Sequence, residues 1–184
     1  MTIYTIGHSN LSIKTFLTFL HRFEIQLLVD VRSNPYSRYH PQFNYNPLKM
    51  SLTNENFTYQ YGGDKIGGNY SDINLQFIDG GVNYSKVECL KEFVQGIDRL
   101  VLGSIEHTNV IIMCAEKDPY FCHRFALISH TLSKKNINTV HILPEVNKIM
   151  NNAELEDKMR SEYGRSYSLD ELYAYHNWVM FHYK

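Results

Sequence analysis

The sequence predicts a three-layer α/β/α protein with a mainly parallel sheet of about five strands. Five short segments, at 3–7, 25–31, 57–61, 110–114 and 139–143, have the apolar or alternating pattern of strands. Helical patterns lie between several of them, which favours parallel strands joined by right-handed crossovers. The second and fourth segments are almost wholly apolar, as expected of strands that are covered on both faces.

Three helices are predicted from apolar residues at helical spacing. Ser85 with Glu88 forms a capping-box pattern at the start of the second helix. Asp118 followed by Pro119 is a typical start for the third. The apolar stripes are Ile13, Phe16, Leu17 and Leu20; then Val87, Leu90, Val94, Ile97 and Val101; then Phe121, Phe125, Ile128 and Leu132.

The bulk composition indicates one folded domain, 1–184, in the cytoplasm. Lys and Arg number 18 and Asp and Glu 19, so the net charge of −1 argues against a polybasic binder of nucleic acid or of membranes. Three cysteines are too few for a disulfide-stapled secreted domain. No apolar run approaches the ~20 residues that span a bilayer, and we expect no signal peptide.

The chain from 144 to 184 is expected to be a helical extension. Ser168 and Glu171 form a second capping-box pattern, which leads into the aromatic segment "LYAYHNWVMFH". We expect this last helix either to pack back on the domain or to form a homodimer contact. Two segments, 33–48 with three prolines and 62–83 with six glycines, are expected to be binding or catalytic loops.

Polar groups follow each predicted strand, and in a parallel sheet the loops at the carboxyl ends converge on one crevice. We therefore expect a site at this edge of the sheet. Its candidate residues are His8, Ser9, Asp30, Arg32, Ser37, Arg38, Gly67, Gly68, Cys114, Glu116, Cys122, His123 and Arg124.

Each candidate also has a simpler structural interpretation. Gly7 permits a tight turn, Ser9 or Asn10 caps the next helix, and Asp30 pairs with Arg32 two residues away. His141, inside a strand pattern, is expected to be a core histidine, and Cys89, inside a helical pattern, a structural residue.

Several motifs together resemble the domain-of-unknown-function 488 family. They are "TIGHS" at 5–9, "DVRSNPYSR" at 30–38, "QF" at 42–43, "GG" at 67–68, "CAEKDPYFCHR" at 114–124 and "VHI" at 140–142. The resemblance covers a core of about 1–143. It implies an α/β domain of the bacterial or archaeal cytosol and supports the choice of site residues, but it implies no established reaction.

The two cysteines of the last long motif suggest thiol chemistry. Cys114 at the end of a strand is similar to a rhodanese or Cys-phosphatase nucleophile, but nine residues separate it from Arg124 and its loop holds two carboxylates, which oppose a thiolate. Cys122 is expected in the first turn of a helix, where the helix dipole lowers the pKa of a thiol. Glu116 is a candidate general acid or base, with His8 or His123 as its counterpart.

The leading hypothesis is an enzyme that acts on a small anionic or nucleotide-like substrate, held by Arg32, Arg38 and Arg124, with no cofactor required by the sequence. One alternative is a zinc or iron site made by Cys114, Cys122 and His123 with His8 or His40. The second alternative is a non-enzymatic module that binds nucleotides or nucleic acid through the Tyr-rich loop. The near-zero net charge disfavours it.

Overall fold

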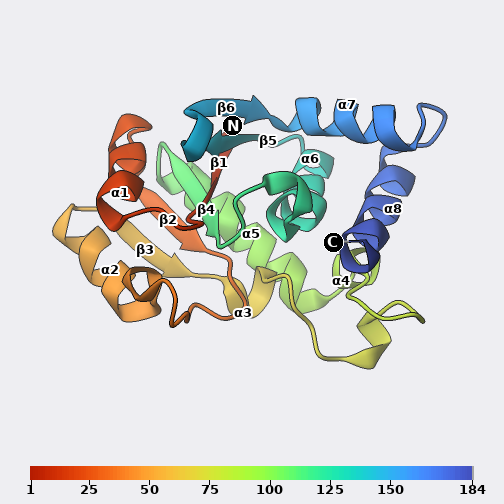
Figure 1. The fold of residues 1–184 in the computed structure, drawn as a ribbon, viewed down its shortest axis with the longest axis horizontal. Coiled ribbons are helices and arrows are strands. Elements are labelled where there is room, and N and C mark those ends of the chain that lie inside the picture. The colour runs from red at the N-terminus through yellow and green to blue at the C-terminus, as the bar shows by residue number, and fades with distance from the viewer. Residues whose placement is uncertain (184) are drawn as a thin grey trace.

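Within residues 1–183, which the computed structural model describes apart from the side chain of residue 145, a six-stranded sheet has the order β3-β2-β4-β1-β5-β6 (Figure 1). The strands are β1 (Thr2–Gly7), β2 (Leu27–Asp30), β3 (Thr58–Tyr61), β4 (Val110–Cys114), β5 (Asn138–Leu143) and β6 (Lys148–Asn151). The five predicted strands are confirmed and run parallel, whereas β6, which was not predicted, pairs antiparallel with β5.

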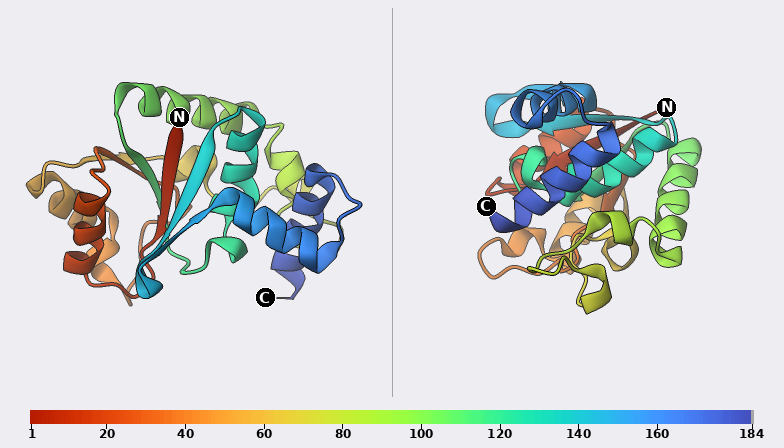
Figure 2. Two further views of the ribbon diagram at one scale, coloured as in Figure 1. Left: turned by 90° about the horizontal axis from the view of Figure 1, so that it is seen from above. Right: turned by 90° about the vertical axis from the view of Figure 1, so that its right-hand side faces the viewer.

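Helices cover both faces of the sheet, so the predicted three-layer α/β/α class is confirmed (Figure 2). On one face, α1 (Ile13–Arg22) and α2 (Tyr45–Asn54) bury Phe16, Leu20 and Leu52 against β2, β4 and β1. On the other face lie α5 (Lys91–Glu106), a π-helix (Arg124–Ser129) and α6 (His130–Lys134). Successive strand residues therefore point into two separate hydrophobic cores.

The second predicted helix is interrupted, and its expected capping box is wrong. Asn83 caps the short α4 (Tyr84–Val87) by accepting a hydrogen bond from the amide of Ser85, which places Ser85 inside that helix. The long helix α5 begins only at Lys91, because Leu90 is extended. Cys89 lies in this break and is exposed, so its expected position within a helix is also wrong.

Helical turns occupy parts of both expected loops. In the first, a 3-10 helix (Pro41–Phe43) precedes α2, whose first turn contains Pro47. Proline is tolerated there because amides of the first turn have no partner within the helix. The second holds α3 (Gly63–Ile66), a 3-10 helix (Ile73–Leu75) and a bridge between Gln76 and Val82.

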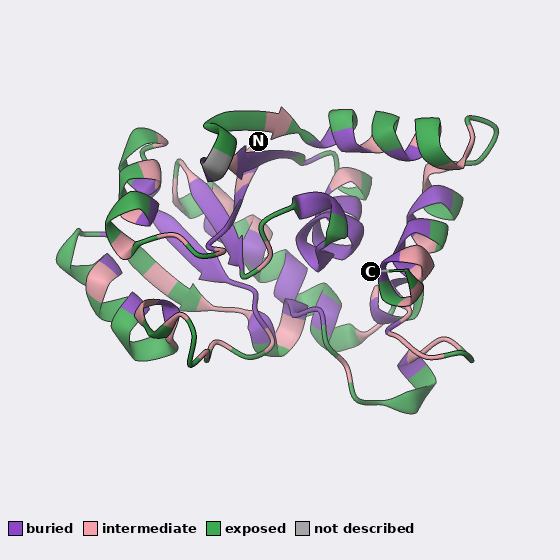
Figure 3. Cartoon of the chain, in the orientation of Figure 1, coloured by how far each residue is buried: buried purple, intermediate pink, exposed green. Residues whose placement is uncertain are grey.

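The C-terminal helices α7 (Asn152–Tyr163) and α8 (Leu169–His182) form one end of the molecule, and their inner faces are buried (Figure 3). The predicted capping box of Ser168 and Glu171 is confirmed. Helix α8 packs back on the rest of the chain, where the Asn177 side chain accepts a hydrogen bond from the amide of Tyr84 at 2.8 Å and donates one to the carbonyl of Val82 at 3.1 Å. None of the described helices is both long and apolar enough to cross a lipid bilayer.

Candidate functional site

Four side chains with sulfur, oxygen and nitrogen donors meet at the carboxyl end of β4. The donor atoms of Cys114, Glu116, Cys122 and His123 all lie within 4.8 Å of one another. Oε2 of Glu116 is 2.6 Å from the sulfur of Cys114 and 3.3 Å from that of Cys122. Nδ1 of His123 is 3.7 Å from each of the two sulfurs. We call this group the thiol cluster.

The backbone around Cys122 explains how the side chains of the adjacent residues Cys122 and His123 both reach the thiol cluster. The start at Asp118 and Pro119 is confirmed only for a single 3-10 turn (Pro119–Phe121), and Cys122 then adopts an extended conformation. Its carbonyl accepts hydrogen bonds from the amides of Phe125 and Ala126, so the next helix starts after it. The expectation that Cys122 lies in the first turn of a helix is therefore wrong. Neighbours on an α-helix diverge by about 100°, and the extended residue removes that divergence.

A backbone contact fixes the orientation of the His123 ring. Nε2 of His123 lies 3.0 Å from the carbonyl oxygen of Val31, which can only accept, so Nε2 carries a proton and Nδ1 faces the two sulfurs. Gly68 packs closely against the same ring, because a Cβ added there would lie 2.7 Å from Cγ and 2.9 Å from Nδ1 of His123. Two contacts therefore restrict the ring.

Burial and charge set the protonation of the cluster. Burial, together with the neighbouring Cys122, raises the pKa of the Cys114 thiol well above its ordinary value, so this thiol is neutral at pH 7. Although burial acts in the opposite direction, the hydrogen bond from Cys114 and the charge of His123 lower the pKa of Glu116 to about 2. Burial alone would lower the pKa of His123, but the neighbouring Cys114 and Glu116 outweigh this effect and raise it.

The loop that carries Glu116 is fastened to the end of β1. The amides of His8 and Ser9 donate to the carbonyls of Cys114 and Ala115 at 2.9 and 3.0 Å. A Cβ at Gly7 would overlap the carbonyl oxygen of Glu116, so glycine is required by close approach and not only by a turn. The left-handed φ of 44° at Ser9 adds local backbone strain, and its hydroxyl contacts Asn10.

Arg124 supports the same loop from inside the protein. Its side chain is fully buried, and Nη2 donates to the carbonyl of Lys117 at 2.9 Å. Among the described residues, its Nε and Nη1 have no hydrogen-bond partner. The side chain of Arg124 thus positions the loop through its bond to a backbone carbonyl, and its expected role as a substrate clamp stays a prediction.

A second polar group lies at the same edge but on the opposite face of the sheet, on the side of α1 and α2. Arg32 forms a bidentate pair with Asp30 (2.9 Å from Nε and 2.6 Å from Nη2) and also donates to the carbonyl of Phe43 at 2.7 Å. Tyr59 donates its hydroxyl to Asp30 at 3.0 Å. The pairing of Asp30 with Arg32 is therefore the structural alternative expected from the sequence. We call this group, completed by His8, the arginine brace.

His8 completes the brace as a neutral acceptor. Its Nε2 is 3.2 Å from Nη1 of Arg32, which can only donate, so Nδ1 carries the proton and donates to the carbonyl of Ser9 at 2.9 Å. Its ring stacks on Phe43 with centroids 4.3 Å apart. Burial and the Arg32 charge lower the pKa of His8 to about 4.

Comparison with known proteins identifies the family. The model of the family described as "Domain of unknown function DUF488" matches residues 12–131, which is more than half of the chain. The chain belongs to the DUF488 family. This match includes the thiol cluster, but it is shorter than the expected core of 1–143, and the motifs at 5–9 and 140–142 lie outside it. No curated protein and no solved structure shows a significant match.

The remaining candidates of this DUF488 chain order the loop that follows β2. Ser37 receives hydrogen bonds from the amides of Tyr39 and His40, while the exposed Arg38 lies 5.5 Å from the ring of Tyr39. Gly67 packs closely on Ser33. These residues do not enter the thiol cluster.

The expected metal set is only partly matched by the geometry. Cys114, Cys122 and His123 do come together, but their fourth companion is Glu116. His8 and His40 instead lie near one another, with ring centroids 6.0 Å apart, on the side of the brace. The sequence predicted Glu116 as a general acid or base and not as a metal ligand. Its position two residues after Cys114 could have indicated a ligand role. His141 is buried between Thr5 and Asn152, which confirms that it is a core histidine.

Proposed function

We propose that this DUF488 protein is a metalloprotein that binds a zinc-class ion through Cys114, Cys122 and His123, with Glu116 at the fourth position. The observation that carries the proposal is the convergence of four donor atoms within 4.8 Å. Two sulfurs and one imidazole nitrogen form a soft donor set, which suits zinc or iron and not magnesium or calcium. The orientation of His123 by a backbone carbonyl is the usual support of a metal-bound histidine.

The distances between the donors fit a tetrahedral ion. Zinc lies about 2.3 Å from sulfur and about 2.0 Å from nitrogen or oxygen, so two ligand atoms of one ion are about 3.5 Å apart. Of the four close contacts between donors, three measure 3.3, 3.7 and 3.7 Å. The fourth, 2.6 Å between Glu116 and Cys114, is too short for this geometry and is instead a hydrogen bond from the thiol.

Glu116 is therefore the ligand that has to move when an ion enters. It is only half-buried, whereas Cys114 and Cys122 are 3% and 1% exposed. Three firmly held protein ligands with an exchangeable fourth position are typical of catalytic zinc sites, whereas structural sites are closed by four. An ion held there supplies Lewis-acid polarisation. Displaced from it, the Glu116 carboxylate remains close enough to accept a proton.

The energetics of the two thiols also favour an ion. Burial keeps Cys114 neutral, and among the described residues no lysine or arginine forms a hydrogen bond with the sulfur of Cys114 or Cys122. A bound cation stabilises thiolates in such surroundings, because a coordinating thiol is deprotonated outright.

A thiol enzyme without metal is the second candidate. It is favoured by one observation, the position of His123 at 3.7 Å from each sulfur, where the imidazole can take a thiol proton. The near-complete burial of both sulfurs opposes it, since a small anionic substrate has to reach the nucleophile.

Metal content and thiol reactivity distinguish the two candidates. We expect one equivalent of zinc or iron in the purified protein by plasma mass spectrometry, and thiols at Cys114 and Cys122 that react only after chelation. In a competition titration with a chromophoric chelator, Cys122→Ser should weaken zinc binding by more than about 100-fold, beyond what is typical of losing an outer-shell partner.

Matched variants serve as controls. Cys89→Ser removes an exposed thiol and should leave zinc affinity unchanged. Glu116→Gln should keep the one-to-one stoichiometry if the fourth position is exchangeable, and loss of all binding would indicate a closed structural centre. Rapid, chelator-insensitive modification of Cys122 in a metal-free protein would support the thiol enzyme and contradict the metal site.

A further inference from the structure

The two thiols of the cluster lie close enough to each other to be joined by a disulfide. Both sulfurs contact the same oxygen, Oε2 of Glu116, and the same nitrogen, Nδ1 of His123. Because all donor atoms of the cluster lie within 4.8 Å of one another, the sulfurs of Cys114 and Cys122 are no farther apart than that. A disulfide bond is about 2.05 Å long, and rotation of one cysteine side chain between staggered rotamers moves its sulfur by about 3 Å. One such rotation is large enough to close the gap.

The chain between the two cysteines allows this movement. Only seven residues separate them, so little chain entropy is lost when the loop is closed. Ala115, Lys117 and Asp118 are exposed on this segment, which therefore adjusts at the surface and not in the core. Cys122 is extended between a 3-10 turn and the π-helix, so its side chain is free of the rotamer restriction that a preceding helical turn imposes.

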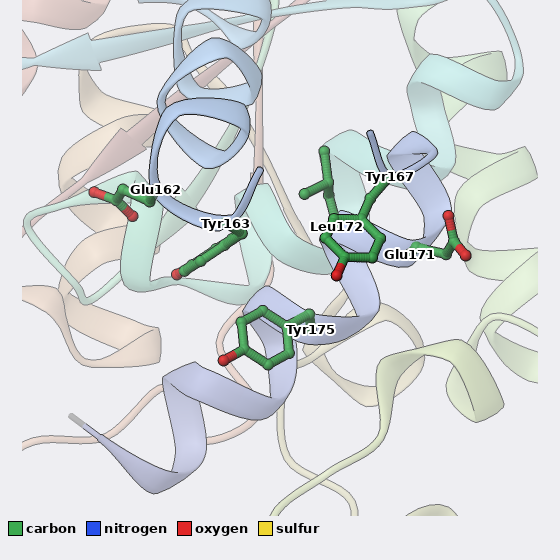
Figure 4. A pocket seen from close by; sticks show the side chains of 6 residues that line it. All are labelled: Glu162, Tyr163, Tyr167, Glu171, Leu172 and Tyr175. Atoms are coloured by element: carbon green, nitrogen blue, oxygen red, sulfur yellow. The ribbon is translucent and has the colours of Figure 1, made fainter. Parts of the chain in front are cut away.

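The surroundings of the sulfurs favour a small oxidant. Cys114 and Cys122 are buried, and the half-buried Glu116 is the most exposed member of the cluster. Large cavities lie elsewhere: one of about 460 Å³ between the end of α7 and the start of α8 (Figure 4), and one of about 540 Å³ beside Trp178. Neither is lined by a cysteine, so these cavities give a bulky reactant no approach to the sulfurs, whereas hydrogen peroxide is small enough to pass Glu116.

We propose that a small peroxide joins Cys114 and Cys122 in a disulfide, so that the cluster alternates between an ion-bound dithiolate and an ion-free disulfide. The alternation rests on the proposed function, whereas disulfide formation by itself does not. Metal ions bind thiolates, and a disulfide sulfur carries no negative charge. Oxidation therefore removes two of the three firmly held ligands, and a bound ion in turn protects the thiolates from oxidation.

The oxidation consumes one peroxide and releases two waters. The sulfur of Cys122, whose bond to Glu116 is the longer one, attacks a peroxide oxygen. The O–O bond breaks, the departing oxygen leaves as water with the thiol proton, and Cys122 becomes a sulfenic acid. The sulfur of Cys114 then attacks the Cys122 sulfur, the S–S bond forms, and the S–O bond breaks. The second water leaves with the proton of Cys114, and the two sulfurs have given two electrons to the peroxide.

Tryptic peptides make the disulfide directly observable. Trypsin cleaves after Lys117, so the two cysteines fall in separate peptides, 100–117 and 118–124. We expect metal-free protein with Cys89→Ser, which removes the exposed thiol, to yield these peptides joined after treatment with hydrogen peroxide, as detected by mass spectrometry. Dithiothreitol should separate them, and a further Cys114→Ser change should abolish them. Sulfinic or sulfonic acid at either cysteine without joined peptides would overturn the proposal.

Zinc binding separates this inference from the proposed function. The oxidised protein should take up no zinc until it is reduced. Free zinc at ten times its Kd should slow the joining of the peptides about tenfold, because only about a tenth of the chains then lack the ion. Equal rates with and without zinc, in a protein that binds zinc, would overturn the alternation of the two states. If the reduced protein binds no zinc, the metal site is wrong, and the joined peptides still decide whether the disulfide forms.

Discussion

The thiol cluster and the arginine brace lie at the same edge of the sheet, but their polar groups are satisfied in different ways. In the brace, Arg32 uses its donors on Asp30, Phe43 and His8. In the thiol cluster, four donor atoms lie close to one another, and His123 also contacts the carbonyl of Val31 outside the cluster. The brace pairs a cation with an anion, whereas the donors of the cluster converge on one another, which is the arrangement that the proposed metal site uses. Buried polar groups therefore become candidates for function when several potential ligands converge on one point.

Breaking the brace should have the largest effect on folding. Arg32→Met leaves Asp30 buried without its cation, and loss of one partner of a buried ion pair costs about 3–5 kcal/mol. The free energy of unfolding from urea denaturation measures this loss. Arg99→Met, which removes an exposed cation, should change it by less than about 0.5 kcal/mol. If Arg32→Met matches that control, the brace is not structural. The double variant Asp30→Leu/Arg32→Met should recover much of the stability.

Acid should weaken the brace through His8. Its pKa is about 4 in the folded protein and 6.5 ordinarily, so between these values the unfolded chain binds more protons. Stability contributed by neutral His8 is present above pH 6.5 and is lost on acidification toward pH 4, by about 1.4 kcal/mol for each pH unit.

Urea unfolding of the metal-free protein at pH 7 and pH 5 tests this dependence against His8→Asn, in which an amide oxygen can still accept from Arg32. The variant should lose less stability than the wild type over this range. An unchanged difference between the two pH values would show that His8 is not the group responsible.

The smallest predicted effect is on the zinc affinity of the thiol cluster. A methyl group in Gly68→Ala pushes on the His123 ring, and displacing the support of a metal-bound histidine lowers metal affinity by about 10- to 100-fold. Gly80→Ala is the control for backbone strain without contact with the ring, because its φ of 100° disfavours alanine while a Cβ there meets nothing within 4 Å. Zinc competition titrations compare the two. Equal affinities would mean that the ring orientation has no part in metal binding.

The sequence predicted the five parallel strands and the edge at which the polar residues gather, because apolar strands, and polar residues that follow their carboxyl ends, leave clear patterns. It did not reveal that the candidates divide between two faces. Gly7 pairs with Cys114 in the sheet, so the next residue, His8, points to the opposite face. That inference needs the strand order, which requires contacts between residues about a hundred positions apart.

The convergence at Cys122 was beyond the sequence for another reason. Asp118 and Pro119 are strong helix-start signals, and they do start a helix, but only one turn long. The extended residue that follows is stabilised by tertiary packing of Tyr120 and Phe125 in the core with α7 and α8. Local propensity cannot foresee such a break, since the packing partners come from the last part of the chain.

Val31 gives the two faces a common point. Its amide donates to Met113 within the sheet, its carbonyl receives His123 of the cluster, and the next residue is Arg32 of the brace. Only one peptide unit separates the two groups, so a shift of the His123 ring is transmitted to the backbone that carries the guanidinium. Binding of a metal ion at the thiol cluster should therefore slow hydrogen exchange at backbone amides beside the arginine brace. Weakening the brace should in turn lower the affinity of the cluster for that ion.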